Sequence, residues 1–321
     1  MSETFEVLTA EEASADVFLS TSAMSPYQEQ LRDYLDSLLR QGCTRLDWCL
    51  VVVAAGKPVA RVALWAPPDR PVPTDVVLID ADWSDASLSA AREALSSAQD
   101  LARSLGAEAL GHSLDTPPVP PQYQEDEEAR ARLLRETGYD LLRDGLRWRF
   151  VPAASRPTEQ PKSLAFRALP DVGDDAFVDA IAATYQGTRD SWIGREIEER
   201  GLAGAARADF AAYREMEHLP EWWELAYGED GSLAGVIMVA RNPGMAVIGY
   251  VGVVPEHRGH GLSTQLVLRG TQRLVAGGAD EIRGDCDRDN VAMARAFERA
   301  GYEQFARRRT YRRPLTSAGD S

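Results

Sequence analysis

A glycine-spaced turn between an apolar run and a helical pattern constrains the fold of this chain more than any other stretch. Residues 246–254 are apolar and rich in β-branched side chains, and after a proline the turn reads R-G-H-G-L-S over 258–263. Apolar residues then recur with helical spacing over 264–276. The pattern predicts a strand, a sharp turn and a helix, in which Gly259 and Gly261 let backbone N–H groups approach a ligand. With the positive end of the helix dipole, such groups favour a phosphate or pyrophosphate.

The turn differs from two common nucleotide loops. No Gly-Lys-Ser/Thr follows it, as a Walker A loop requires, and Thr264 stands where the dinucleotide fingerprint needs its third glycine. It resembles instead the acyl-CoA loop of the GNAT superfamily of N-acetyltransferases. The family signature Q/R-x-x-G-x-G/A falls on Arg258, Gly261 and Ser263, with Ser263 as a small replacement for Gly or Ala. The alternative is an ordinary strand–turn–helix corner.

The resemblance implies a co-substrate and a place for it. Acetyl-CoA is expected to lie along 246–254, where the last backbone groups pair with the pantetheine arm and one N–H polarises the thioester carbonyl. The glycine turn is expected to hold the pyrophosphate, and an amine attacks directly without an acyl-enzyme. The residues implied to bind acetyl-CoA are Val251, Gly252, Val253, Arg258, Gly259, His260, Gly261, Leu262, Ser263 and Asn290.

Proton transfer is less well defined by the resemblance. Phe297 stands where the family often has a tyrosine that protonates the departing thiolate, and a phenyl ring has no proton to give. Because a free thiol has a pKa near ~8.5, the thiolate either leaves with little help or receives its proton from a water or another tyrosine. Tyr250 is one of the two catalytic candidates.

The first candidate for the general base is Asp285. It lies five residues before Asn290, where some relatives keep a glutamate, and Asp287 follows two residues later. Two neighbouring carboxylates favour proton uptake by one of them, which suits a base. The alternative for Asp-x-Asp beside a turn is a solvated loop. Glu224 is a weaker candidate.

The acceptor side is predicted from residues outside the loop. Tyr185, Trp192, Trp222 and Glu224 are the candidates for an acceptor pocket, and core packing is the alternative role of the rings. A net charge of −15 suits a cationic small-molecule amine as the partner. The same charge argues against nucleic acid, whose phosphates need clustered Lys and Arg.

Composition sets further bounds. The 321 residues suffice for two domains of ordinary size. No apolar run approaches the ~20 residues of a membrane helix and no signal peptide is evident, so we expect a cytoplasmic protein without membrane contact. Three cysteines and four histidines without metal spacing predict reduced thiols and no metal site. The expected state is a monomer or homodimer.

The two halves of the chain follow one order of elements, which predicts a tandem repeat. Each has a hairpin, a strand, a long helix, a short strand, a helix ending in Gly-Tyr and a closing hairpin. The expected fold is α/β (α+β): two tandem GNAT-like domains, each a mixed, mostly antiparallel central sheet flanked by helices. The predicted boundaries are 1–151 for the first domain, 152–163 for a linker, 164–315 for the second domain and 316–321 for a disordered tail.

The first copy is expected to be degenerate. Residues 80–87 stand in the place of its phosphate loop, contain no glycine and carry Asp80, Asp82 and Asp85. These carboxylates would repel a pyrophosphate, so the first domain is expected to bind no CoA. Its role is then structural, or it contributes to the acceptor site.

Three interpretations of the whole chain compete. The leading one is a tandem acyltransferase with one working CoA site, and the second is a non-catalytic acyl-CoA-binding or regulatory protein of the same fold. Turnover distinguishes these two, since both bind CoA. The third, a nucleotide-binding protein unrelated to CoA, predicts no CoA binding.

Overall fold

The computed structural model describes residues 4–22, 25–68, 70–84, 88–153, 164–188, 190–242 and 245–315. Its contacts divide the chain into two compact units: unit 1 contains Met1–Leu142 and Arg308–Ser321, and unit 2 contains Arg143–Arg307. This division differs from the predicted boundaries, because most of the closing strand of each sequence half is assigned to the other unit. The predicted linker beyond residue 153 and the predicted tail lie outside the described residues.

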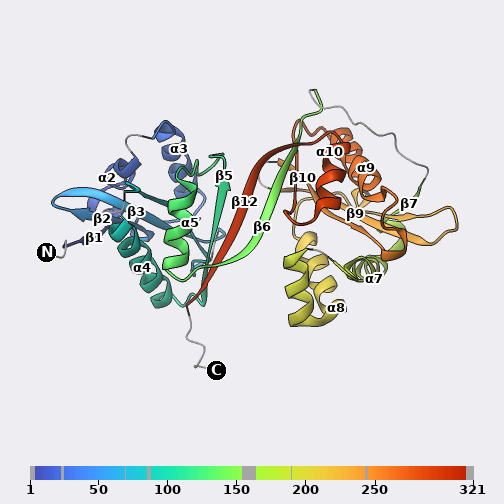
Figure 1. Ribbon diagram of the computed structural model, residues 1–321, viewed down its shortest axis with the longest axis horizontal. Coiled ribbons are helices and arrows are strands. Elements are labelled where there is room, and N and C mark those ends of the chain that lie inside the picture. Colours follow the sequence, from blue (N-terminus) through green and yellow to red (C-terminus); the bar gives the residue numbers. More distant parts are fainter. Residues whose placement is uncertain are drawn as a thin grey trace. The chain divides into compact units, whose positions relative to one another are not determined.

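Unit 1 is a sheet with helices packed on both faces (Figure 1). Its elements are β1 (Glu6–Thr9), α1 (Ala10–Ala13), α2 (Ala15–Leu19), η1 (Ser20–Ser22), α3 (Gln28–Arg40), η2 (Leu46–Trp48), β2 (Cys49–Ala54), β3 (Lys57–Trp65), β4 (Asp75–Ala81), α4 (Leu88–Ser104), β5 (Ala109–Thr116) and α5 (Glu127–Glu136). The strand order is β1-β2-β3-β4-β5 followed by β12 (Glu303–Pro314). Only β4 and β5 pair in parallel among the pairs registered from β1 to β5. Alternation along β2 sends Val51 towards α2 and α3 and Val52 towards α4.

Unit 2 repeats this plan. Its elements are β6 (Asp140–Phe150), β7 (Ala165–Ala168), α6 (Leu169–Val172), α7 (Asp174–Tyr185), α8 (Ser191–Arg214), η3 (Pro220–Trp222), β8 (Glu224–Tyr227), β9 (Leu233–Asn242), β10 (Met245–Val253), η4 (Pro255–His257), α9 (Leu262–Ala276), β11 (Ile282–Asp287) and α10 (Val291–Arg299). The order is β6-β11-β10-β9-β8-β7, and only β10 and β11 pair in parallel in this registered set. The predicted fold class, two tandem α/β units with mixed and mostly antiparallel sheets, is confirmed.

Each sequence half ends in one long strand, and the predicted closing hairpins are wrong. Asp144-Gly145 is a dipeptide that favours a tight turn, yet it stays extended inside β6. Gly145 pairs in register with Asp287, and Arg307 donates two hydrogen bonds of 2.6 Å to Asp144. Tertiary pairing therefore overrides the local turn preference. In β12, no glycine or asparagine interrupts Glu303–Pro314.

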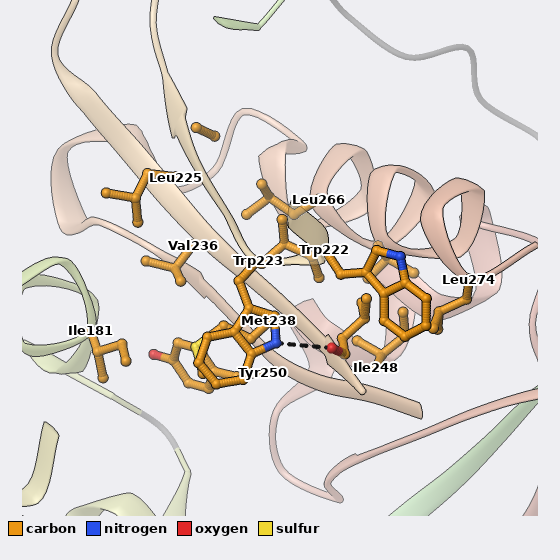
Figure 2. Packing of buried hydrophobic residues seen from close by; sticks show 14 of the residues in the cluster. Ile181, Trp222, Trp223, Leu225, Val236, Met238, Ile248, Tyr250, Leu266 and Leu274 are labelled. Carbon is orange, nitrogen blue, oxygen red and sulfur yellow. Dashed lines mark hydrogen bonds between the residues drawn. The ribbon is translucent and has the colours of Figure 1, made fainter. Parts of the chain in front are cut away.

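Two adjacent tryptophans show how the core of unit 2 fills both faces of its sheet. Trp223 lies against Phe177 of α7 and Phe210 of α8, and its indole N–H donates a 2.9 Å hydrogen bond to the carbonyl of Val239. Trp222 instead reaches the end of α9, where its ring fills the space beside Gly277. Figure 2 shows the two rings pointing away from each other. Side chains that alternate between faces place consecutive residues in separate environments.

Candidate active site

The turn after β10 has the geometry expected of a phosphate loop. Gly259 and Gly261 adopt φ angles of +81° and +78°, in the left-handed region that favours glycine. Gly261 is the N-cap of α9, and the first turn, which begins with Leu262 and Ser263, contains no acidic residue and receives no side-chain cap. A Cβ added at either glycine would meet no atom within 4 Å, and His260 between them is exposed. A ligand can therefore approach the N–H groups at the positive end of the α9 dipole.

Beyond the start of β10, its edge towards β11 has no registered partner strand. The parallel register contains only Ala246 with Ile282 and Val247 with Arg283. On its other side β10 stays paired with β9 as far as Val253. We call the stretch after Val247, where β10 and β11 are out of register, the unit 2 splay.

The backbone groups of Val251 and Val253 point into the unit 2 splay. The N–H of Val254 donates a 3.1 Å hydrogen bond to the carbonyl of Ala234, on the β9 side. Because backbone groups alternate along a strand, those of Val251 and Val253 face the other way. A bulge between Ile248 and Tyr250 resets the register just before this segment. An extended ligand is thus offered hydrogen-bonding groups like those of a strand.

Arg258 braces the turn. Its guanidinium donates to three backbone carbonyls, those of Val253 at 3.1 Å, Gly187 at 3.1 Å and Thr184 at 2.9 Å. The side chain therefore ties the end of β10 to the end of α7. Arg258 stays a predicted anion-binding residue, and its three hydrogen bonds maintain the shape of the loop.

Two residues of the late family pattern have defined structural contacts. The Asn290 side chain accepts a 3.2 Å hydrogen bond from the N–H of Met293 and caps α10. Phe297 is buried and stacks on Trp148 with ring centroids 5.8 Å apart. The Trp148 indole N–H in turn lies 3.4 Å from Cys286 Sγ. The ring of Phe297 therefore serves packing at this position.

Tyr250 lies beside the splay with its hydroxyl over Gly252. Thr184 Oγ1 donates to the carbonyl of Ile181 at 2.8 Å, so it accepts from the Tyr250 hydroxyl at 2.5 Å. Burial raises the pKa of Tyr250 well above its usual value. A Cβ at Gly252 would lie 2.6 Å from that hydroxyl and 2.5 Å from Thr184 Oγ1. The absence of a side chain at Gly252 is what admits the phenol.

The two aspartates of β11 do not form the expected carboxylate pair. Asp285 is 38% exposed and lies 3.5 Å from the Arg147 guanidinium. Asp287 is buried and accepts three hydrogen bonds, from Arg143 Nε at 2.6 Å and from the N–H and hydroxyl of Ser191 at 2.7 and 2.6 Å. Each carboxylate therefore has an arginine of its own.

The four predicted acceptor residues do not come together. Tyr185 is buried and donates to the Asp209 carboxylate of α8, and Trp192 is 37% exposed near the start of that helix. Trp222 and Glu224 lie on the α9 side. Trp223 stands between them in the sequence and points to the α7 and α8 side, so Trp222 and Glu224 both point the other way.

Glu224 is part of a buried ion-pair network. Its carboxylate accepts hydrogen bonds of 2.6–3.3 Å from Arg269 and Arg273 of α9. Burial raises the pKa of Glu224, but these hydrogen bonds outweigh it and the net pKa is lowered. A carboxylate held ionised in this way fixes α9 on the sheet.

Sequence reasoning missed Asp209. This half-buried carboxylate accepts a hydrogen bond from the Tyr185 hydroxyl. Desolvation raises the pKa of Asp209, and the nearby Glu196 and Asp190 raise it further. Tyr213 lies one turn later on α8 and donates a 2.9 Å hydrogen bond to the carbonyl of Gly249 on β10. The i, i+4 spacing of an acid and a tyrosine was the available signal, but many surface helices carry such pairs.

The corresponding site in unit 1 has no equivalent open loop among the described residues. Asp80 lies 3.0 Å from Arg130 and 3.5 Å from Arg61. These two arginines compensate the negative charge from which we expected repulsion of a pyrophosphate. Asp82 is exposed, and Asp85 lies outside the described residues.

A splayed parallel strand pair, a glycine turn and an uncapped helix start together form the candidate site of unit 2. A model of the acetyltransferase (GNAT) family matches residues 184–302, which contain these elements. Residues 184–302 are therefore similar to the GNAT family of acetyltransferases.

Several known proteins resemble this chain in sequence or in fold. An acetyltransferase of Yersinia pestis (strain Pestoides F) is 29% identical over 90 residues, which are 28% of this chain and 63% of that protein. The chain thus spans less than two thirds of the curated relatives' length. A GCN5-related N-acetyltransferase from Sphaerobacter thermophilus has a similar fold over 99% of this chain and 98% of its own, with a TM-score of 0.58 and 19% identity. A GCN5-related glucosamine N-acetyltransferase region of a fungal multi-domain β-N-acetylglucosaminidase covers 97% of this chain and 38% of that one, with a TM-score of 0.52 and 12% identity.

The described part of the chain contains neither a membrane-spanning helix nor a metal-binding cluster. No helix there combines the length and apolar character needed to cross a bilayer. The same residues contain no group of three or more His, Cys, Asp or Glu side chains placed to hold a metal ion. All three cysteines are buried and unpaired.

Proposed function

We propose that unit 2 transfers the acetyl group of acetyl-CoA to the amine of a cationic small molecule. The observation that carries this proposal is the joining of the unit 2 splay to the glycine turn of α9. The turn suits a pyrophosphate, and the backbone groups of Val251 together with the N–H of Val253, whose carbonyl is held by Arg258, suit an extended amide-containing arm. One molecule with both features is acyl-CoA, and we expect its thioester beside Tyr250.

The reaction is a direct displacement. The amine nitrogen attacks the thioester carbonyl carbon, the carbon–sulfur bond breaks, and the acetyl group forms an amide. A backbone N–H in the splay stabilises the charge that develops on the carbonyl oxygen. The amine loses one proton to a base, and the CoA thiolate takes up a proton from solvent or from the Tyr250 hydroxyl. The protein supplies orientation and a path for these protons.

Asp209 is our candidate for the base. Its desolvation and its carboxylate neighbours raise its pKa, which makes it a better proton acceptor than an ordinary aspartate. It is hydrogen-bonded to Tyr185, whose ring meets Tyr250 edge to face at 5.9 Å. Tyr185 and Arg200 lower the pKa of Asp209 without outweighing desolvation, whereas Asp285 forms an ion pair with Arg147. Asp285 stays the alternative predicted from the sequence.

The acceptor is a cation because negative charge gathers beside Tyr250. Asp209 and Glu196 lie on α8 and Asp190 caps that helix; both neighbours raise the pKa of Asp209, although Glu196 pairs with Arg200 and Asp190 with Arg143. A protonated amine is attracted by this field and reaches Asp209 before it reacts. The tyrosine rings around Tyr250 offer faces that also favour cations.

The experiment is a calorimetric titration with acetyl-CoA, followed by thiol-release assays with a panel of amines. Gly261→Asp should abolish binding, because it puts a carboxylate where the pyrophosphate is expected. Gly278→Asp is the matched control. Gly278 resembles Gly261 in its φ of +83° and in having no atom near an added Cβ, but it lies beyond the other end of α9. Retained affinity in Gly261→Asp would remove the loop assignment. Binding without thiol release for any amine would favour the non-catalytic acyl-CoA-binding protein.

A further inference from the structure

Unit 1 contains a splay like that of unit 2. Its parallel strands β4 and β5 register only at Asp75 with Gly111. Beyond that pair the edges of β4 and β5 face each other out of register, as β10 and β11 do. The two splays differ in the connection that follows the second strand. Residues 117–126 join β5 to α5, whereas only residues 288–290 join β11 to α10.

The β4 edge of the unit 1 splay is hydrogen-bonded by side chains. The carbonyl of Val76 accepts from His112 Nδ1 at 2.8 Å, and the N–H of Leu78 donates to Gln122 Oε1 at 3.0 Å. The carbonyl of Ile79 accepts from Arg130 of α5. Val76 and Leu78 are two residues apart, so their backbone groups lie on the side that a strand-like ligand would use.

The β5 edge is satisfied by one residue, Gln124. Its Oε1 accepts from the N–H of Asp115 at 2.9 Å, and its Nε2 donates to the carbonyl of Ser113 at 2.9 Å. The second Nε2 proton points to His112 Nε2 at 3.1 Å. Because a carbonyl only accepts, His112 carries its proton on Nδ1, which leaves Nε2 free to accept from Gln124. One assignment of protons therefore satisfies the whole network.

The network leaves little room for anything else. His112, Gln124 and Arg130 are all buried. The cavity that remains beside Gln122 has a volume of about 10 Å³, enough for one water molecule. It is bordered by Arg61, whose buried Nε has no partner in the described chain and would be satisfied by that water. Tyr123 of the same segment stacks on Tyr27, with ring centroids 4.5 Å apart.

We propose that residues 117–126 are a built-in occupant of the unit 1 splay. Gln122 and Gln124 make the backbone hydrogen bonds that the pantetheine arm of acyl-CoA would make, and they exclude that arm. Unit 1 is thus closed by its own chain, and the protein binds a single acyl-CoA in unit 2. The binding of acyl-CoA by unit 2 rests on the function proposed above, whereas the closure of unit 1 does not.

Backbone amide exchange on the full chain tests this occupancy. Without ligand, the amides of Leu78 and Asp115 should exchange slowly, since side chains hold them, while that of Val251 should exchange faster. Acetyl-CoA should protect Val251 and leave Leu78 and Asp115 unchanged. Protection of the β4 amides by acetyl-CoA, or two binding sites per chain in calorimetry, would overturn the proposal.

Variants separate this proposal from the proposed function. Gln122→Ala should accelerate exchange at Leu78 at least tenfold, with Val52 in the core of β2 unchanged as a measure of global stability. Gln41→Ala, an exposed glutamine of the same unit, is the control and should leave Leu78 unaltered. Unchanged exchange at Leu78 in Gln122→Ala would refute the occupant. Because this readout needs no ligand, it stands even if unit 2 fails to bind acetyl-CoA.

Discussion

Gln122 Oε1 lies 3.0 Å from the backbone nitrogen of Leu78 and accepts its proton. In unit 2 the backbone of Val251 points into the corresponding splay, and no side chain of the described residues bonds it. One plan of strands and helices therefore occurs twice, once with its splay filled by the chain and once with it open. The proposed closure of unit 1 thus depends on the segment 117–126, which has no counterpart of equal length in unit 2.

Gly252→Ala should destabilise unit 2 and slow acyl transfer. The new Cβ would fall 2.5 Å from Thr184 Oγ1 and 2.6 Å from the Tyr250 hydroxyl, which forces one of them to move. Overpacking of this kind costs about 1–3 kcal/mol of unfolding free energy, measurable by urea denaturation. In a Tyr250→Phe background the cost should shrink, because the clashing oxygen is gone. An equal cost in both backgrounds would mean that Tyr250 is not the limiting contact.

Asp209→Asn should lower kcat by about 100-fold or more, with little change in acetyl-CoA affinity, because a general base acts only in the chemical step. The amide can still accept from Tyr185, so the fold should be kept. In the wild-type protein, kcat should fall as the pH drops through the raised pKa of Asp209, since only the ionised form takes up a proton. This acidic limb should disappear in the variant.

Asp285→Asn is the matched comparison. If Asp209 is the base, Asp285→Asn keeps a near wild-type rate, because this exposed side chain loses only its contact with Arg147. The reverse outcome, a slow Asp285→Asn and an active Asp209→Asn, would restore the base predicted from the sequence. Rates across pH 5–9 for both variants decide between them.

The stability of unit 1 should fall as the pH is lowered from about 6.5 to about 4. Burial lowers the pKa of His112 to about 4 from its ordinary 6.5, so the unfolded chain binds a proton in this range and the native one does not. The nearby Arg130 lowers this pKa further, and Asp115 raises it. This difference in proton binding lowers the free energy of unfolding by up to about 3 kcal/mol.

His112→Asn isolates this effect from the carboxylates. The variant should be less stable than wild type at pH 7, and the difference should narrow towards pH 4. A constant difference across this range would show that His112 titrates normally. Its ring resonances, followed by NMR, should likewise show a neutral imidazole at pH 5.

The sequence was informative wherever function depends on local backbone geometry. The R-G-H-G-L-S turn, its two left-handed glycines and the helix after it are all encoded within a few residues, so they could be predicted. The order of strands and the repeat followed from hydrophobic periodicity for the same reason.

What depends on distant contacts could not be predicted. Asp144-Gly145 favours a turn, but pairing with β11 keeps it extended. Trp222 and Glu224 looked like acceptor residues because their types suit such a pocket, yet alternation and two arginines of α9 place them elsewhere. Asp209 acquires its character only from the burial and the tyrosine that the folded unit supplies.

Glu224→Gln should destabilise unit 2 by about 3 kcal/mol, because it leaves Arg269 and Arg273 without their buried counter-charge. Because folding lowers the pKa of Glu224, the stability that this carboxylate contributes is complete above its unfolded pKa and is lost as the pH falls through its folded pKa. The destabilisation caused by Glu224→Gln should therefore vanish in acid. Denaturant midpoints at pH 7 and pH 3 measure this. The KM for the amine should not change below the melting temperature. A raised KM with unaltered stability would instead return Glu224 to the acceptor pocket.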